Sequence, residues 1–125
     1  FEEWPTKVVT SPFEVGIAIQ YPGASIENDF TWAEGGHPMV EAYKAYLPMP
    51  YDRPTWDLTS VLYAVEGDSF FTMHGPFTME VTEKGGTIFN PDEKGNRYFM
   101  MVDEAQAAAI NKHFQELIPI KPANR

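Results

Sequence analysis

The clearest pattern in the chain is a set of stretches whose apolar residues recur at the spacing of one helix face. The first stretch begins at Pro38, a residue type that favours the first helical position, and the prolines after Leu47 end it. The second follows Thr55, which we expect to be the N-cap. Its apolar positions cover a broad face, so we expect this helix to be buried. Those positions are Leu58, Val61, Leu62 and Val65.

A third helix is predicted near the end of the chain. Asp103 and Gln106 have the spacing of a capping box, in which each side chain bonds the backbone N–H of the other residue. The helix should run to about Ile118, before the prolines that follow it. The positions expected to face the core are Ala107, Ile110, Phe114 and Leu117.

The remaining pattern predicts strands and turns. Residues 7–10 read as a short strand, while residues 20–37 hold several glycines and a proline and are expected to be mostly loop. Further runs rich in β-branched and aromatic residues lie at 70–73, 77–82, 87–89 and 97–101. Turns are expected at 75–76, 84–86 and 92–95. The pattern predicts an α/β fold, with a strand-helix-helix part over 1–67 and an antiparallel β meander plus terminal helix over 68–125.

Composition and charge exclude several classes of partner. A chain of 125 residues fits one domain or part of one. Its net charge of −9 argues against nucleic acid and against anionic membranes. The chain has no cysteine and no apolar run long enough to span a membrane. It does not begin with Met, and residues 1–5 resemble the end of a helix, so we expect the protein to continue upstream.

The histidines and the short motifs favour structural roles. His37, His74 and His113 are far apart and lack the spacing of a zinc site. We expect them at a helix start, a turn and a polar helix face, respectively. Residues 90–97 are acidic but lack the alternating carboxylates of a calcium loop, so a hairpin turn is favoured. The signatures of nucleophilic hydrolases and of nucleotide-phosphate loops do not occur.

Trp56-Asp57 is the pair that could carry chemistry. It places a carboxylate in the first turn of an apolar helix, directly after a large aromatic ring. One interpretation is that Asp57 only complements the helix dipole, an effect of some tenths of a kcal/mol. The other is that Asp57 is a metal ligand beside a stacking surface. No acidic cluster elsewhere in the chain would finish such a metal site.

Four runs together resemble one family. They are Trp4-Pro-Thr-Lys-Val-Val-Thr-Ser-Pro-Phe-Glu-Val-Gly16, His37-Pro38 with Ala42-Tyr43, Arg53-Pro-Thr-Trp-Asp-Leu-Thr-Ser-Val-Leu-Tyr-Ala-Val65, and the segment 71–91. In this order they are similar to the C-terminal part of inosine-uridine-preferring nucleoside hydrolase-like proteins of bacteria. The resemblance covers nearly the whole chain. It implies the end of a larger, Rossmann-like domain whose N-terminal half lies upstream.

The resemblance also implies roles for three residues. Asp57 would be one ligand of a Ca²⁺ ion that holds the ribose hydroxyls and the attacking water. Trp56 stands where pyrimidine-accepting members often have His, so it would stack on the base, with purine preferred. Glu14 would be a pocket or supporting residue. The other ligands and the general base come from upstream in the family, so the resemblance implies no catalytic residue in this chain and no activity for the chain alone.

Three functional hypotheses follow. The first is part of a calcium-dependent N-glycosyl hydrolase that cleaves ribonucleosides to base and ribose. The second is a non-catalytic protein of the same fold that binds a nucleoside or carbohydrate, which the high aromatic content suits. The third is a stabilising subdomain that forms a homo-oligomer through its antiparallel strands. The expected partners are a small nucleoside or sugar ligand and the upstream half of the same protein.

Overall fold

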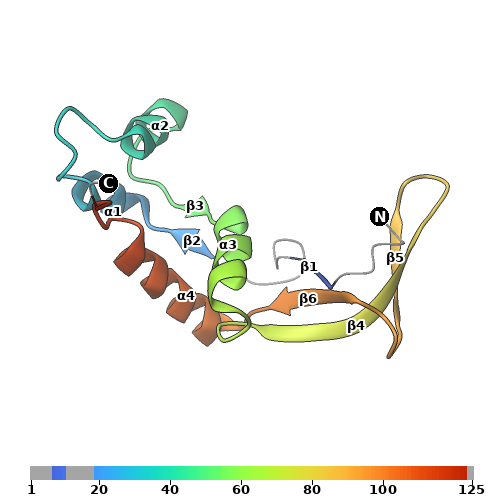
Figure 1. Cartoon of the computed structure of the whole chain (residues 1–125). Helices are drawn as coiled ribbons and strands as arrows, with labels where there is room; N and C mark the ends of the chain where they lie inside the picture. Colours follow the sequence, from blue (N-terminus) through green and yellow to red (C-terminus); the bar gives the residue numbers. More distant parts are fainter. Residues whose placement is uncertain (1–6, 11–18, 124–125) are drawn as a thin grey trace.

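A computed structural model describes residues 7–10 and 19–123, without the side chains of Thr10, Glu27 and Trp56. The described part is mixed α/β, with four helices, a four-stranded mixed sheet and a two-stranded sheet. Figure 1 shows the helices gathered at one end of an elongated molecule and a long β hairpin reaching to the other. None of the described helices combines the length and apolar character that crossing a bilayer requires.

The large sheet is built around one long strand, β4 (Thr72–Val81). Its first half pairs antiparallel with β6 (Arg97–Met101), and its second half pairs antiparallel with β5 (Thr87–Pro91). The strand β1 (Val8–Thr10) pairs parallel with β6, which gives the order β1-β6-β4-β5. Antiparallel pairing is confirmed, but the predicted meander is wrong, because β5 and β6 follow one another in the chain and both pair with β4 instead of with each other. The parallel edge strand β1 makes the sheet mixed.

The turn predicted at residues 75–76 is wrong, because β4 runs straight through it. The pairing with β6 shifts register between His74 and Phe77, as at a β-bulge. Gly75 has a φ of 148°, and a Cβ there would lie 2.7 Å from the carbonyl oxygen of Arg97. The glycine therefore permits a close approach of two strands. His74 accordingly lies in a strand and not at a turn.

The other two predicted turns are confirmed. The Gly85 N–H donates to the carbonyl of Thr82, and the Thr82 N–H donates to that of Gly86, which closes the hairpin between β4 and β5. The Gly95 N–H donates to the carbonyl of Asp92 between β5 and β6. The acidic segment 90–97 thus serves as a turn between strands.

A small sheet and two short helices are formed by residues 20–54, directly before α3. β2 (Gln20–Tyr21) pairs antiparallel with β3 (Arg53–Pro54). Between them lie α1 (Gly23–Asp29) and α2 (Pro38–Tyr46). The expectation that residues 20–37 are mostly loop is wrong for α1. Its first residue is a glycine because the carbonyl of Tyr51 lies 1.8 Å from where a Cβ would stand.

Three helix starts were predicted, and at two of them a side chain caps the helix. His37 accepts a bond from the Met39 N–H at 3.2 Å and starts α2, as predicted. Asp103 and Gln106 form both bonds of the capping box at the start of α4 (Glu104–Leu117). Thr55 is the N-cap residue of α3 (Trp56–Glu66), but its hydroxyl makes no cap bond to the helix. The side-chain cap expected from Thr55 is therefore wrong, because its hydroxyl donates to the carbonyl of Ile19.

The hydrophobic core lies where the helices pack against the end of the large sheet that is closest to them (Figure 1). Its most deeply buried side chains are Ile26, Met100 and Ile110. Phe114 is buried as predicted, but Leu117 is 46% exposed. On α3, Leu62 is buried, whereas Val61 and Val65 are exposed, so the predicted burial of the whole apolar face is wrong. The core reaches only one side of that helix.

Candidate functional site

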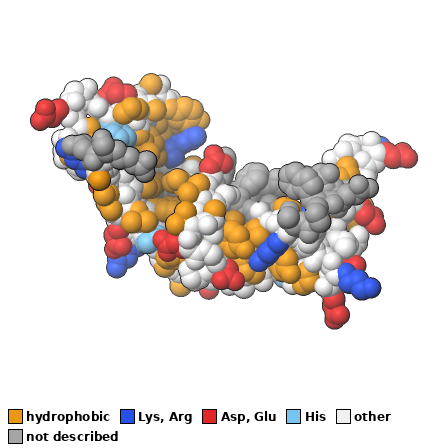
Figure 2. Space-filling view, in the orientation of Figure 1, with side chains coloured by type: hydrophobic (Ala, Val, Ile, Leu, Met, Phe, Trp, Pro, Cys, Tyr) orange, Lys and Arg blue, Asp and Glu red, His pale blue; other side chains and the backbone are white. Residues whose placement is uncertain are grey.

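A cavity of about 380 Å³ lies at the N-terminal end of α3. The first turn of α3 contributes Asp57 and Leu58, and the small sheet contributes Tyr21 and Arg53. Tyr43 from α2 and Ile118 after α4 line the other sides. Figure 2 shows hydrophobic side chains gathered over the region where α2 faces this end of α3. Segments that are far apart in sequence therefore meet around one carboxylate.

Thr55 fixes the position of the first turn of α3. Its N–H and its hydroxyl both donate to the carbonyl oxygen of Ile19, each at 2.9 Å. The Thr55 side chain is buried, and the residue directly precedes the helix. The hydroxyl thus ties the helix start to the segment entering β2 and does not cap the helix. This anchor sets where the exposed side chain of Asp57 projects at the cavity.

Two neutral tyrosines form part of the cavity wall. Tyr21 is buried and donates from its hydroxyl to Oδ2 of Asp29 at 2.6 Å. Burial, followed by this hydrogen bond, raises the pKa of Tyr21 well above its usual value. Burial also raises the pKa of Tyr43, with Tyr51 adding to the effect. Both phenols stay protonated through the physiological pH range. The Tyr21 hydroxyl is engaged by Asp29, whereas Tyr43 is half-buried and gives the cavity wall a polar but uncharged group.

Two residues that line the cavity, Tyr43 and Arg53, pack against further aromatic rings beside it. The rings of Tyr43 and Tyr51 stack at 5.3 Å, and the Tyr51 hydroxyl donates to the carbonyl of Tyr43 at 2.7 Å. The guanidinium of Arg53 lies over the Tyr46 ring, 4.5 Å from its centroid. Such an arrangement holds a positive charge in place through the electron-rich face of the ring. The rim therefore combines stacking surfaces with a fixed cation.

The structure places Asp57 at the cavity but does not assemble a complete metal site around it. No group of three or more His, Asp or Glu side chains in the described ranges 7–10 and 19–123 could hold a metal ion. Calcium takes six to eight oxygen ligands, and one carboxylate supplies at most two. The side chain of Trp56 and the whole of Glu14 lie outside the described residues. Asp57 fits Ca²⁺ only as one ligand among others.

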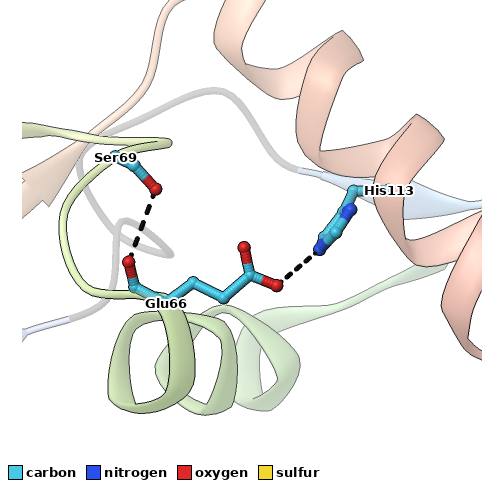
Figure 3. Close-up of polar contacts among 3 residues, drawn as sticks. All are labelled: Glu66, Ser69 and His113. Carbon is cyan, nitrogen blue, oxygen red and sulfur yellow. Dashed lines mark hydrogen bonds and ion pairs between the residues drawn. The ribbon is translucent and has the colours of Figure 1, made fainter.

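The histidines take part in packing and in polar contacts between elements. His37 stacks on Phe30 with ring centroids 4.2 Å apart, in addition to starting α2. His74 meets the edge of Phe77 at 5.2 Å. His113 was predicted on a polar helix face, and its Nε2 lies 2.7 Å from Oε1 of Glu66, a contact between α4 and α3 that the sequence did not indicate (Figure 3). The structure does not bring these three side chains together at the cavity.

Sequence reasoning singled out Asp57 but missed Tyr21, Tyr43 and Arg53 as its neighbours. Tyr43 lies in the helix predicted from Pro38 and in one of the runs that resemble the family, but neither gives it a role at a site, and nothing near Tyr21 in the sequence marks a site. The sequence does contain one sign of these neighbours. Arg53 is a cationic residue three positions before the pair Trp56-Asp57. These residues become a site only when β2 and β3 pair and bring two distant segments to the start of α3.

Comparison of the chain with known protein families, with curated proteins and with solved structures gives no significant match. The residues and the geometry of the cavity are therefore what indicate a function.

Proposed function

We propose that the chain is the C-terminal part of a calcium-dependent N-glycosyl hydrolase that cleaves ribonucleosides, with purine nucleosides preferred. The observation that carries the proposal is that Asp57 lines a cavity of about 380 Å³ at the start of α3. A volume of this size suits a small ligand such as a nucleoside. The rest of a Rossmann-like, nucleoside hydrolase-like domain would be supplied by polypeptide outside these 125 residues.

Asp57 would act as one oxygen ligand of the ion. A hard cation prefers carboxylate oxygen, and the first turn of a helix is a fixed platform for such a ligand. The cation would bind the ribose hydroxyls and polarise a water molecule. The remaining ligands and the base would come from outside the described residues.

Trp56 and Glu14 keep the roles that the sequence suggests. An indole next to Asp57 would stack on the nucleobase, but its N–H is too weak an acid to transfer a proton to a leaving group near neutral pH. Protonation of the leaving base would therefore fall to another group. Glu14 would support the pocket from the segment that follows β1. Tyr43, held protonated, would contact the ligand as a neutral phenol. Tyr21, whose hydroxyl donates to Asp29, would form buried wall behind it.

A second candidate is a non-catalytic protein that binds carbohydrate or nucleoside at the same cavity. The cluster of Tyr43, Tyr46 and Tyr51 with Arg53 favours it, because aromatic rings beside a cavity stack well on sugar rings and the Tyr46 ring is exposed. This candidate needs no general base and no complete metal shell.

The test compares the protein extended to its natural upstream sequence with its Asp57→Asn variant. Release of ribose from inosine and uridine is measured with and without Ca²⁺. Cleavage that requires Ca²⁺ and prefers inosine is expected, with a loss of more than about 100-fold in the variant, because outer partners of ligands alone contribute 10–100-fold. The matched control is Glu93→Gln, an exposed carboxylate in the turn between β5 and β6.

Three outcomes separate the candidates. Full cleavage in Asp57→Asn would remove Asp57 from the mechanism. Calorimetric binding of nucleosides or oligosaccharides without any cleavage would favour the second candidate. Neither binding nor cleavage would overturn both.

A further inference from the structure

One side of the cavity at the start of α3 carries a positive charge. Arg53 lines the cavity from β3, and its side chain is exposed. Its guanidinium lies over the Tyr46 ring, 4.5 Å from the ring centroid. Packing on a ring restricts a long side chain, so less conformational entropy is lost when a ligand binds to it. Arg53 is therefore a cation that is held in place before a ligand arrives.

This charge is not neutralised by a neighbouring side chain of the described residues. No carboxylate in the described part of the chain forms an ion pair with Arg53. The adjacent Asp52 lines a different hollow, of about 280 Å³, and accepts a bond from the Gly23 N–H at 3.0 Å. Asp57 lines the same cavity as Arg53 without pairing with it. The cavity wall therefore holds one cation and one anion at separate positions.

The charge of Arg53 acts within the cavity. Burial raises the pKa of Tyr43, which lines the cavity wall, and the positive charge of Arg53 opposes that rise. A charge that acts on this phenol also acts on a ligand that lies against it. The whole chain has a net charge of −9, which disfavours the approach of anions elsewhere on its surface. Arg53 thus gives an acidic protein one local position that favours a negative group.

We propose that Arg53 binds an oxyanion on the ligand of this cavity, so that a phosphorylated or carboxylated sugar or nucleoside is preferred to a neutral one. A guanidinium presents two parallel N–H groups that match two oxygens of a phosphate or a carboxylate. The inference rests on the proposed function for the place of the ligand and adds the substrate class, a nucleoside 5′-monophosphate instead of a free nucleoside. Arg53 determines specificity and takes no part in bond cleavage.

The test measures binding by calorimetry at low ionic strength, with the protein extended to its natural upstream sequence and with Ca²⁺ present. The ligands are ribose 5-phosphate and ribose, neither of which has an N-glycosidic bond to cleave. Ribose 5-phosphate is expected to bind about tenfold or more tightly, as charged hydrogen bonds of this kind allow. Arg53→Met should abolish this preference. Arg53→Lys should restore part of it, because a lysine keeps the charge but not the fork of N–H groups.

The matched control is Lys44→Met. Lys44 is an exposed cation on α2 that pairs with Glu41 at 3.9 Å and is not among the described residues lining the cavity. Its replacement should leave the ratio of the two affinities unchanged. The pairing of β3 with β2 uses backbone groups, so Arg53→Met should keep the fold, which circular dichroism verifies. A parallel pair of ligands, glucuronate and glucose, distinguishes a carboxylate from a phosphate.

The outcomes are separable. A preference for glucuronate alone that disappears in Arg53→Met would keep Arg53 as the oxyanion site and replace the phosphate by a carboxylate. Equal affinities within both ligand pairs, or no binding of any of the four, would overturn the proposal. A preference that survives Arg53→Met, or that Lys44→Met removes equally, would also overturn it. The proposed function is judged by inosine cleavage and its loss in Asp57→Asn, so the two proposals fail separately.

Discussion

Replacing Thr55 by valine tests how the start of α3 is held in place. The substitution keeps the shape of the side chain but removes the hydroxyl that donates to the carbonyl of Ile19 at 2.9 Å in a buried position. That carbonyl keeps its bond from the Thr55 N–H, so no acceptor is left unsatisfied. The expected loss is therefore about 1 kcal/mol in the free energy of unfolding, in the middle of the range for one net hydrogen bond.

Urea unfolding followed by circular dichroism measures this loss. With slopes of about 1–3 kcal/mol per molar urea, the midpoint should fall by roughly 0.3–1 M at unchanged slope. The control is Thr78→Val, because the Thr78 hydroxyl makes only a long, exposed bond of 3.4 Å to the carbonyl of Asn90. It should change stability by less than about 0.5 kcal/mol. An unchanged midpoint for Thr55→Val, or an equal fall in the control, would refute the anchoring role.

Two further predictions concern the capping box and the buried phenol. Asp103→Ala removes the side chain that accepts from the Gln106 N–H at 2.7 Å and should cost about 0.5–2 kcal/mol, read from the urea midpoint; a change under 0.3 kcal/mol, roughly the resolution of such data, would contradict it. Tyr21 has a pKa in the folded chain above its unfolded value of about 10, so its contribution is fully present below pH 10 and is lost as the pH rises toward the folded value. Stability should therefore decline above about pH 10 in melts. Tyr21→Phe should decline less steeply, and an identical profile would show that Tyr21 is not responsible.

Some elements of the fold were predictable because their causes are neighbours in the sequence. His37 with Pro38 marks the start of α2, and Asp103 with Gln106 marks the start of α4. In each case the bonds that begin the helix join residues two or three positions apart. A pattern read along the chain contains all the information that such a contact needs.

Other elements depend on contacts that a linear pattern does not contain. Gly23 begins α1 and Gly75 lies inside β4 because distant backbone carbonyls approach them closely. In sequence, the same glycines indicate only loop and turn. The apolar positions of α3 predicted burial correctly for Leu62 and wrongly for Val65. Periodicity reports which face of a helix is apolar, but not which polypeptide covers that face.

The residues of the candidate site also fall into two groups, those that the sequence indicates and those that only the fold brings together. Asp57 was recognisable from its position after an aromatic residue at a helix start. Its neighbours Tyr21 and Tyr43 were not, because the pairing of β2 with β3 and the packing of α2 bring them to the cavity. The proposed roles of Trp56 and Glu14 rest on sequence resemblance, since the described side chains do not include them.

The two halves of the long strand β4 have different neighbours. Its first half belongs to the part of the sheet that borders the helices, while its second half pairs only within the hairpin with β5. Figure 1 shows the end of this hairpin on the opposite side of the molecule from α2 and the start of α3. The exposed turn at residues 82–86 is therefore a suitable attachment point for a fluorophore, an affinity tag or a surface linker. A label placed there would leave the cavity unobstructed.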